Sequence, residues 1–253
     1  MNDWRELEYG ENIAPVYDSI IASEVNTDDA VAFLTELAAE HDAHTLLELG
    51  SGTGRLLFPL QAAGLEVAGI ELSPAMIERM RAKPGGAQLD VLVGDMTEFE
   101  LDRRFDLILI AFNTLYCLDS SERQRACLRT AAGHLSPGGL LVIETHLPYP
   151  LTRMPARGMT PLALDHGRAV LAAYRHDQLG QVIETTAIIL SSDGIGVYPN
   201  RNRYAWPAEL DLMAELSGLT LLERFADWNK APFTGYVDSQ LCLYEAARRS
   251  GPK

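Results

Sequence analysis

The stretch LLELGSGTGRLLFPL, residues 46–60, determines what kind of architecture this chain can adopt. An apolar run ends at Glu48, three glycines follow at alternate positions (Gly50, Gly52 and Gly54), and helix-forming residues continue the chain. Such a strand–turn–helix lets a backbone close on a ligand, because glycine has no side chain to hold the ligand away. By itself the loop fits a dinucleotide site, a phosphate loop or a tight turn.

The residues around the glycines separate these alternatives. A Walker phosphate loop needs Gly-Lys-Ser/Thr at a fixed offset, and no such triplet follows here. The dinucleotide fingerprint needs a third small residue three positions after the second glycine, and that position holds the bulky Arg55. The loop therefore suits an uncharged or zwitterionic group lying against the backbone.

Short apolar runs alternate with amphipathic segments on both sides of this loop. The expected strands are 44–49, 66–72, 88–95, 105–112 and 140–145. One expected helix starts with Thr27 as its N-cap, and another starts with Ser73 as N-cap and Pro74 at its first position. Continuous apolar strands that alternate with helices predict an α/β fold, with a mostly parallel sheet covered on both faces.

The alternation stops near His146. Residues 148–205 contain strand-like runs separated by the turn sequences QLGQ and SSDG, which predicts an antiparallel insertion at the rim of the sheet. The first pattern then returns with a helix over 207–217 and two further strands. We expect one domain over 1–253, with this insertion before the sixth strand of the sheet.

Composition and charge exclude several classes of protein. The 253 residues are 47% hydrophobic and 22% charged, which is ordinary for a soluble globular chain. The formal charge is −14, from 35 acids against 21 bases, and no Lys/Arg-rich run offers a surface for nucleic acid or an anionic membrane. The N-terminus lacks the order of a signal peptide, and no apolar stretch approaches the roughly 20 residues that span a bilayer. We expect a cytoplasmic protein.

Metal binding is not expected from the cysteines or histidines. The three cysteines lie far apart in apolar surroundings, which predicts buried thiols at Cys117, Cys127 and Cys242. His41 and His44 have HxxH spacing, but they straddle the end of a helix and a loop.

Acidic residues end three successive expected strands. Glu71 lies 21 residues after Gly50, where a carboxylate can accept both hydroxyls of a ribose, and Asp95 ends the next strand. Together with Glu48 they share one edge of a parallel sheet, which is the edge where ligands bind. The sequence therefore predicts a nucleoside site at this edge.

These motifs resemble a class I S-adenosylmethionine-dependent methyltransferase of the type that acts on small amines and natural products. The resemblance covers roughly 40–146 and 207–246, and it rests on LELGSGTG, GIELSPAMI, VGDM, FDLILIAFNTL and HLSPGGLLVIE. It implies S-adenosylmethionine as the cofactor. It also implies a Rossmann-like seven-stranded sheet, mostly parallel with the last strand antiparallel, and an antiparallel β insertion between strands five and six.

The resemblance also implies which residues bind the cofactor. They are Tyr17, Glu48, Gly50, Ser51, Gly52, Arg55, Glu71, Leu72, Asp95, Met96, Ala111 and Phe112. Glu48 and the glycine loop would surround the methionine part, Glu71 would hold the ribose, and Asp95 would take the adenine amino group.

The acceptor is expected at the same edge, over strands four and five. Residues expected to contact it are Tyr9, Asn113, Tyr116, Arg203 and Trp206. His146 is the candidate catalytic base, because a neutral imidazole can accept a proton near physiological pH. A histidine merely hydrogen-bonded at a strand end is the alternative.

Two segments are expected to cover the site. Residues 1–26 resemble an N-terminal lid through Tyr9 and Tyr17, although Tyr17 also fits a helix face in the core. The insertion 148–205 would roof the acceptor, with Arg153 and Arg203 available for an acidic group.

The predicted function is methyl transfer from S-adenosylmethionine to a small-molecule acceptor, with a nitrogen of an amine, amino sugar or amino acid favoured. The alternative is C- or O-methylation of an electron-rich aromatic natural product, which the aromatic residues of the insertion favour. Arg55 disfavours a nicotinamide-dependent oxidoreductase, and the full set of binding motifs disfavours a non-catalytic cofactor-binding module. We expect no metal, nucleic acid or membrane partner, and a homodimer is compatible with this interpretation.

Overall fold

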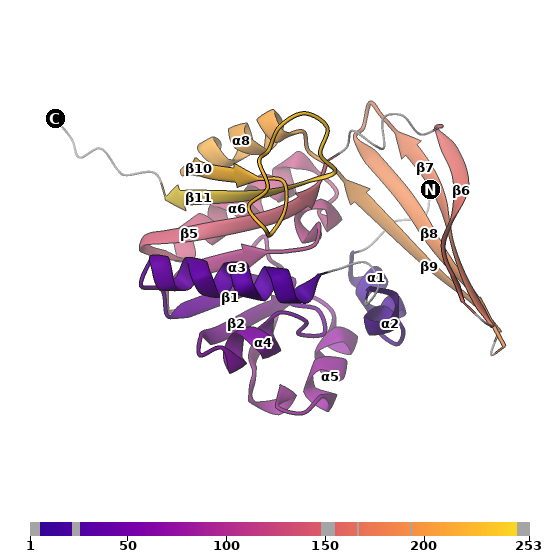
Figure 1. Ribbon diagram of the computed structural model, residues 1–253, viewed down its shortest axis with the longest axis horizontal. Helices are drawn as coiled ribbons and strands as arrows, with labels where there is room; N and C mark the ends of the chain where they lie inside the picture. Colours follow the sequence, from indigo (N-terminus) through magenta and orange to yellow (C-terminus); the bar gives the residue numbers. More distant parts are fainter. Residues whose placement is uncertain (1–5, 22–25, 148–154, 166, 193, 247–253) are drawn as a thin grey trace.

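A seven-stranded sheet forms the centre of the computed structural model, which describes residues 6–21, 26–147, 155–165, 167–192 and 194–246 (Figure 1). The strand order is β10-β11-β5-β4-β1-β2-β3. The strands are β1 (Thr45–Leu49), β2 (Glu66–Glu71), β3 (Asp90–Val93), β4 (Phe105–Ile110), β5 (Leu135–His146), β10 (Leu219–Phe225) and β11 (Ser239–Ala246). Strand β11 runs antiparallel to both of its neighbours, whereas the other pairs are parallel. The expected fold is confirmed.

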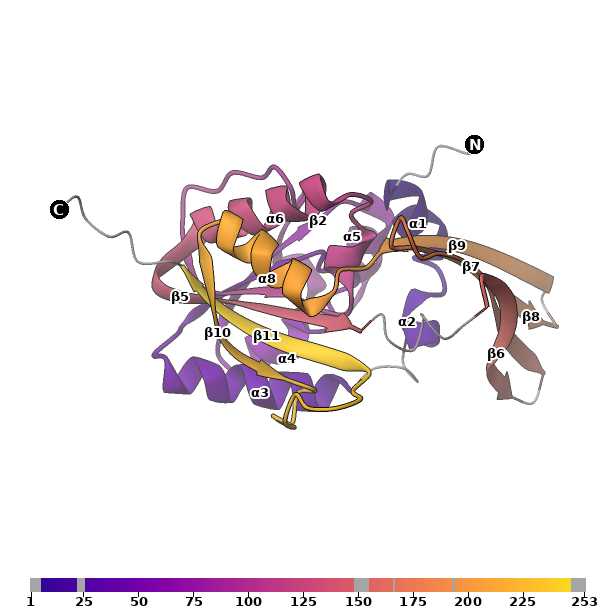
Figure 2. The same ribbon diagram turned by 90° about the horizontal axis from the view of Figure 1, so that it is seen from above.

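Helices cover both faces of this sheet (Figure 2). The helices are α1 (Glu6–Ile13), α2 (Tyr17–Ile21), α3 (Thr27–Glu40), α4 (Leu57–Ala62), α5 (Pro74–Ala82), α6 (Ser121–His134) and α8 (Pro207–Leu216), with short 3-10 turns η1 (Gly86–Gln88) and η2 (Thr114–Cys117). One apolar core joins the sheet to α3, α4 and α5, and a second joins it to α6 and α8. This is the two-sided burial that the continuous apolar strands predict.

Capping residues set the starts of the helices. Ser73 caps α5, because its hydroxyl accepts a hydrogen bond from the backbone N–H of Met76 at 3.3 Å, and Pro74 occupies the first turn as predicted. The N-cap of α3 is Asn26 and not Thr27 as predicted. The Asn26 side chain accepts from the N–H of Asp29 at 3.2 Å, so the amide one residue earlier satisfies that donor.

The insertion forms a separate antiparallel sheet with the order β6-β7-β8-β9. Its strands are β6 (Arg157–Asp165), β7 (Arg168–Asp177), β8 (Val182–Ser191) and β9 (Gly194–Arg203). The QLGQ turn between β7 and β8 is confirmed, and Asp177 stabilises it by accepting from the N–H groups of Leu179 and Gly180. The sequence pattern does not predict β6, because Pro161 and a register shift after it break the alternation.

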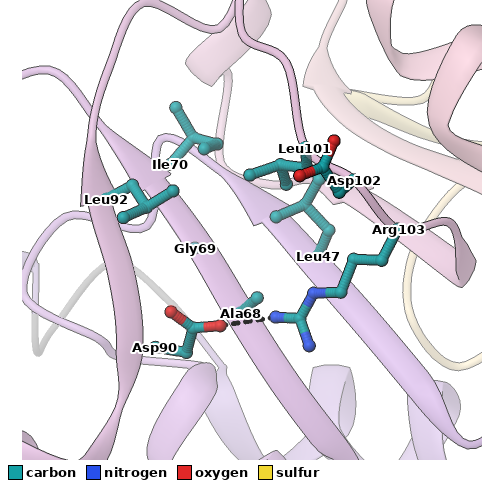
Figure 3. Close-up of a pocket in the computed structure, with 9 residues that line it drawn as sticks. All are labelled: Leu47, Ala68, Gly69, Ile70, Asp90, Leu92, Leu101, Asp102 and Arg103. Atoms are coloured by element: carbon teal, nitrogen blue, oxygen red, sulfur yellow. Dashed lines mark hydrogen bonds and ion pairs between the residues drawn. The ribbon is translucent and has the colours of Figure 1, made fainter.

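A small cavity of about 210 Å³ lies against β1, β2 and β3, beside residues 101–103 (Figure 3). Its lining is mainly apolar, and an Arg103–Asp90 ion pair crosses it at 2.5 Å. Mid-strand residues such as Leu47 and Ala68 line it, so it lies on a face of the sheet, and no residue of the glycine loop is part of its described lining. Within the described part of the chain, no helix is long and apolar enough to cross a bilayer.

Candidate active site

A cavity of about 330 Å³ lies along the edge where the parallel strands end. Its lining comes from the glycine loop, the ends of β2, β4 and β5, helices α1 and α2, and strand β9. The lining residues are Tyr9, Gly10, Ile13, Tyr17, Gly50, Gly52, Ile70, Glu71, Leu72, Ser73, Met76, Gly94, Asp95, Met96, Phe112, Asn113, Thr114, Cys117, His146, Asn200 and Asn202. The cavity therefore joins Glu71 and Asp95 to His146 and to two of the expected acceptor residues, Tyr9 and Asn113, in one volume.

The glycine loop has a backbone that other residues adopt only with strain. Gly50 and Gly54 have φ values of 72° and 82°, in the left-handed region. A Cβ on Gly50 would clash with the side chain of Thr114, so these two segments pack backbone against side chain. The loop turns back on β2, because the N–H groups of Gly50 and Ser51 both donate to the carbonyl of Ile70.

Glu71 ties this loop to the start of α5. One carboxylate oxygen accepts from the N–H of Gly52 at 2.8 Å and the other from the N–H of Ser73 at 2.9 Å. Burial raises the pKa of Glu71, and the two N–H donors oppose that shift without cancelling it. The carboxylate is thus held at the cavity wall in a fixed orientation.

Buried polar atoms with unused hydrogen-bonding capacity lie directly beside the glycine loop. The Oε2 atom of Glu48 and the hydroxyl of Ser51 are both buried without a hydrogen-bond partner among the described residues. Burial raises the pKa of Glu48 to about 8; Arg55 acts against this shift and Glu71 adds to it. Buried polar groups are normally satisfied, so this pair fits a ligand with a polar, cationic end.

Asp95, which follows β3, is held in place in the lining of the same cavity. One oxygen accepts from both the N–H and the hydroxyl of Thr97, at 2.8 and 2.7 Å. The other accepts from Arg123 at 2.8 Å, which fixes the carboxylate next to Met96 in the cavity lining.

The loop after β4 holds two consecutive residues in the left-handed region, Phe112 (φ 47°) and Asn113 (φ 62°). The N–H of Phe112 donates to Glu144 at 2.7 Å, and the side-chain oxygen of Asn113 accepts from the N–H of His146 at 2.6 Å. The rings of Phe112 and His146 meet edge to face, with centroids 6.4 Å apart. Strand β5 therefore shapes this side of the cavity, and His146 itself has an exposed side chain at the lining.

Helices α1 and α2 are attached to the body by two acidic side chains. Glu11 accepts from the hydroxyl of Ser73 at 2.7 Å and from the N–H of Ala75 at 3.0 Å. Asp18 accepts from the hydroxyl of Thr53 at 2.6 Å and pairs with Lys83 at 3.0 Å. Between these contacts, Tyr9 and Tyr17 line the cavity.

Tyr17 packs over the glycine loop, where an added Cβ on Gly52 would lie 3.8 Å from its ring. Burial raises the pKa of its hydroxyl well above the usual range, despite the opposing charge of Arg55. Residues 1–5 and 22–25 of the expected lid lie outside the described residues.

Strand β9 brings two amides to the cavity that sequence reasoning missed. The Nδ2 group of Asn200 donates to Oδ1 of Asn202 at 3.0 Å, and Asn202 in turn contacts the sulfur of Cys117 at 3.7 Å. The alternation in PNRNR puts both asparagines on one face of a strand, but only the sheet register shows that this face meets the cavity.

The structure places three of the expected substrate contacts outside the lining of this cavity. Tyr116 is only 4% exposed, and its hydroxyl donates to the carbonyls of Ala205 and His146, because η2 turns it into the core. Arg203 pairs with Glu209 and also donates to Gln124 at 2.7 Å. Neither lines the cavity.

Trp206, the third of these, lies at the start of α8, edge-on to Tyr204 and 40% exposed. It does not line the cavity. Arg153, expected to meet an acidic group, lies outside the described residues.

The expected cofactor residues fall into two groups. The following line the cavity: Tyr17, Gly50, Gly52, Glu71, Leu72, Asp95, Met96 and Phe112. The others, Glu48, Ser51, Arg55 and Ala111, lie outside the lining. Arg55 donates to the hydroxyl of Thr27 at 3.3 Å, and its guanidinium lies 5.8 Å from the centre of the Phe112 ring.

Among the described residues, no group of three or more His, Cys, Asp or Glu side chains could hold a metal ion.

Comparisons with known proteins agree with this geometry. A family model described as a methyltransferase domain matches residues 46–139. The chain is similar to the CcbJ methyltransferase from Streptomyces caelestis, with 37% identity, 96% of this chain and 100% of that chain covered, and a TM-score of 0.89.

Two further relatives match over nearly the whole chain. One is a cypemycin N-terminal methyltransferase from Streptomyces sp, 26% identical and covering 94% of this chain and 97% of the relative. The other is CalS10, an amino pentose methyltransferase from Micromonospora echinaspora solved with S-adenosylmethionine bound. It is 26% identical, covers 92% of this chain and 97% of its own, and has a TM-score of 0.71.

Proposed function

The chain belongs to the S-adenosylmethionine-dependent methyltransferases, and we propose that it methylates a nitrogen atom of a small-molecule acceptor. One observation carries this proposal. A single cavity runs from Glu71 and Asp95, at the ends of β2 and β3, to Asn113 and His146, at the ends of β4 and β5. A nucleoside at the first end and an acceptor at the second would share one enclosed space.

The residues at the first end fit the cofactor. Glu71 is oriented to hold the ribose hydroxyls. Glu48 and Ser51 lie outside the cavity lining but beside the glycine loop, and their unpartnered oxygens suit the polar methionine end. When bound, S-adenosylmethionine supplies a methyl group that is already activated by a positive sulfur. The protein then has to align the acceptor and exclude water, which is worth roughly 7–11 kcal/mol when orientation is good.

Residues at the second end position the acceptor and accept its proton. Asn113, fixed through the N–H of His146, and the Asn200–Asn202 pair offer neutral hydrogen-bonding groups to it. The imidazole of His146, at the cavity lining, takes the proton from the acceptor nitrogen. Helices α1 and α2 and strand β9 close the cavity on the side away from the sheet.

Two observations favour nitrogen over an aromatic carbon or oxygen. The cypemycin relative and CalS10 are named for an N-terminus and an amino pentose, both of which carry amines. Among the described residues, the insertion contributes two amides and no aromatic ring to the cavity lining. Tyr174, Tyr198 and Tyr204, the aromatic residues of the described part of the insertion, do not line the cavity.

The test is a methylation assay with matched acceptors. Purified protein and S-adenosylmethionine are incubated with amino sugars, short peptides with a free N-terminus, and phenols of similar size, and products are identified by mass spectrometry and NMR. We expect methyl groups on nitrogen only. Methylation confined to phenolic oxygen or ring carbon would assign the alternative reaction. Binding of NAD without binding of S-adenosylhomocysteine, measured by calorimetry, would overturn the cofactor assignment of this chain.

A further inference from the structure

A buried glutamine interrupts the apolar stripe of helix α6. Four residues one turn apart along this helix are buried on the same side of it. Three of them are Cys127, Leu128 and Ala131, and the fourth is Gln124, which is fully buried. A buried amide loses its hydration, so it destabilises the fold unless its hydrogen-bonding groups are used inside the protein. The partners of Gln124 therefore indicate its role.

The Gln124 side chain joins two segments that are distant in the sequence. Its Nε2 group donates to the carbonyls of Leu115 at 3.2 Å and Leu118 at 3.4 Å, in and just after η2. The same group donates to the carbonyl of Arg203, at the end of β9, at 2.7 Å. Its Oε1 atom accepts from the Arg203 guanidinium, also at 2.7 Å. One amide thus ties η2 to β9.

These two segments form adjacent walls of the cavity at its acceptor end. Thr114 and Cys117 of η2 line the cavity, and so do Asn200 and Asn202 of β9. At the cavity itself the walls meet where the Nδ2 group of Asn202 contacts the sulfur of Cys117 at 3.7 Å. Sulfur is a weak hydrogen-bond acceptor, so this contact alone holds the two walls together poorly.

Gln124 is itself held on a rigid element. It lies one turn into α6, and its N–H donates to the carbonyl of Ser120 at 3.0 Å. The residue before it supports the other end of the cavity, because Arg123 donates to Asp95 at 2.8 Å. Two consecutive side chains of one helix thus reach the expected nucleoside end and the acceptor end separately.

We propose that Gln124 is a positioning residue that holds η2 and β9 at a fixed separation, so that their side chains enclose the acceptor. This inference rests on the proposed function, which places the acceptor at that end of the cavity. Gln124 does not line the cavity, so it acts through the residues of η2 and β9 that do. A displacement of about 1 Å in groups that orient a substrate can cost about a hundredfold in rate. A buried amide outside the site can therefore control methyl transfer.

The first test measures how firmly the two walls are held, and it needs no acceptor. Gln124→Met keeps the length of the side chain and removes its amide, and Gln61→Met, at an exposed glutamine on α4, is the matched control. Iodoacetamide alkylates accessible cysteines, and mass spectrometry gives the rate at each one. Cys117 lines the cavity, whereas Cys127 and Cys242 are fully buried. We expect Gln124→Met to speed alkylation at Cys117 alone, by about tenfold or more, because the opening is local.

The second test separates the acceptor from the cofactor. The acceptor is an amino sugar presented as its methyl glycoside, and S-adenosylhomocysteine reports on the cofactor end by calorimetry. We expect Gln124→Met to raise the acceptor KM about tenfold or more, because Asn200 and Asn202 move with β9. The dissociation constant of S-adenosylhomocysteine should change less than about threefold, because Arg123 and Asp95 keep their contact. Gln61→Met should match the unchanged protein in both measurements.

Three outcomes overturn the proposal: an unchanged rate at Cys117 in Gln124→Met, equal acceleration at all three cysteines, or a loss of S-adenosylhomocysteine affinity as large as the rise in KM. Should Gln124→Met fail to fold, Gln124→Glu retains an oxygen for the Arg203 guanidinium and removes the donors to the carbonyls, and the same results are expected of it. The proposed function fails separately. An unchanged protein that binds S-adenosylhomocysteine but methylates no amine loses that assignment, while alkylation of Cys117 still decides whether Gln124 holds the walls.

Discussion

The side chain of Glu144 accepts the backbone N–H of Phe112 at 2.7 Å, across two neighbouring strands of the sheet. Its other oxygen accepts from the indole of Trp228 at 2.6 Å. A left-handed backbone at a residue with a bulky side chain costs about 1–3 kcal/mol unless its surroundings fix it. Glu144 supplies that fixation for Phe112 and Asn113, so a residue on β5 sets the backbone that faces the acceptor end of the cavity.

Changing Glu144 to Ala should therefore impair turnover more than cofactor binding. The loop after β4 loses its acceptor, and about 1–3 kcal/mol of stability is lost with the unsatisfied N–H. We expect kcat to fall about tenfold or more, the fluorescence of Trp228 to change, and the affinity for S-adenosylhomocysteine to change less than about threefold.

The Glu144→Gln variant is tested beside it, because glutamine keeps one side-chain oxygen that can accept a hydrogen bond from the N–H of Phe112. It should recover part of kcat. Glu215→Gln, at an exposed position on α8, is the control. Equal kcat in all three variants and in the unchanged protein would remove Glu144 from the positioning of this loop.

Changing Glu71 to Ala should weaken cofactor binding directly. The carboxylate both faces the expected ribose and holds Gly52 and Ser73, and each charge-assisted hydrogen bond is worth about 1.5–3 kcal/mol. We expect the dissociation constant of S-adenosylhomocysteine, measured by calorimetry, to rise at least about tenfold. Asp90→Ala on the neighbouring strand, outside this cavity, should leave it unchanged. A loss below about threefold for Glu71→Ala counts against the ribose assignment.

Glu48 should make the ligand-free protein less stable as pH rises. Because burial raises its pKa to about 8, the folded protein holds a proton that the unfolded chain has already released above about pH 4.5. Stability attributable to Glu48 therefore falls between about pH 4.5 and about pH 8, with a slope on the order of 1 kcal/mol per pH unit. Urea unfolding at several pH values, compared with Glu48→Gln, measures this. A Gln variant with the same slope as the unchanged protein would show that Glu48 ionises normally.

Changing Asn200 to Ala should affect the acceptor and spare the cofactor. Asn200 lines the acceptor end of the cavity and holds Asn202 by a hydrogen bond. Loss of one neutral hydrogen bond, about 0.5–1.5 kcal/mol, corresponds to a rise of about two- to tenfold in the acceptor KM. Asn229→Ala, on an exposed loop, is the control. A change in S-adenosylhomocysteine affinity as large as the change in KM would move Asn200 to the cofactor side.

The glycine loop and the strand-end acids could be predicted because local rules fix them. Gly50 and Gly54 need a left-handed backbone, and parallel strands bring Glu71 and Asp95 to one edge whatever the packing elsewhere. The alternation of apolar strands with helices likewise predicted a mostly parallel sheet and the position of the insertion.

The residues at the proposed acceptor end of the cavity could not be predicted from local patterns. Their positions depend on which segments, distant in the sequence, lie side by side in the fold. Asn200 reaches the cavity only because β9 crosses α1 with its even-numbered residues inward, and Glu144 matters only because β5 lies beside the loop after β4. Tyr116 and Arg203 share the chemistry of ligand contacts, yet both hydrogen-bond within the protein: Tyr116 to the carbonyls of Ala205 and His146, Arg203 to Glu209 and Gln124. The type of a side chain does not show whether its hydrogen-bonding groups are already satisfied within the protein.

The two acids that attach α1 and α2 to the body have a consequence for the timing of the reaction cycle. Burial opposes the ionisation of Asp18, but Thr53 and Lys83 outweigh it and lower its pKa, so this contact is charged at neutral pH. Tyr17 in the cavity wall lies next to Asp18, so we expect the demethylated cofactor to leave against the Asp18–Lys83 ion pair. Ions in solution weaken such a pair, and product release commonly limits enzymes that close over their ligands. We therefore expect higher ionic strength to speed the release of the demethylated cofactor and to leave the rate of methyl transfer unchanged.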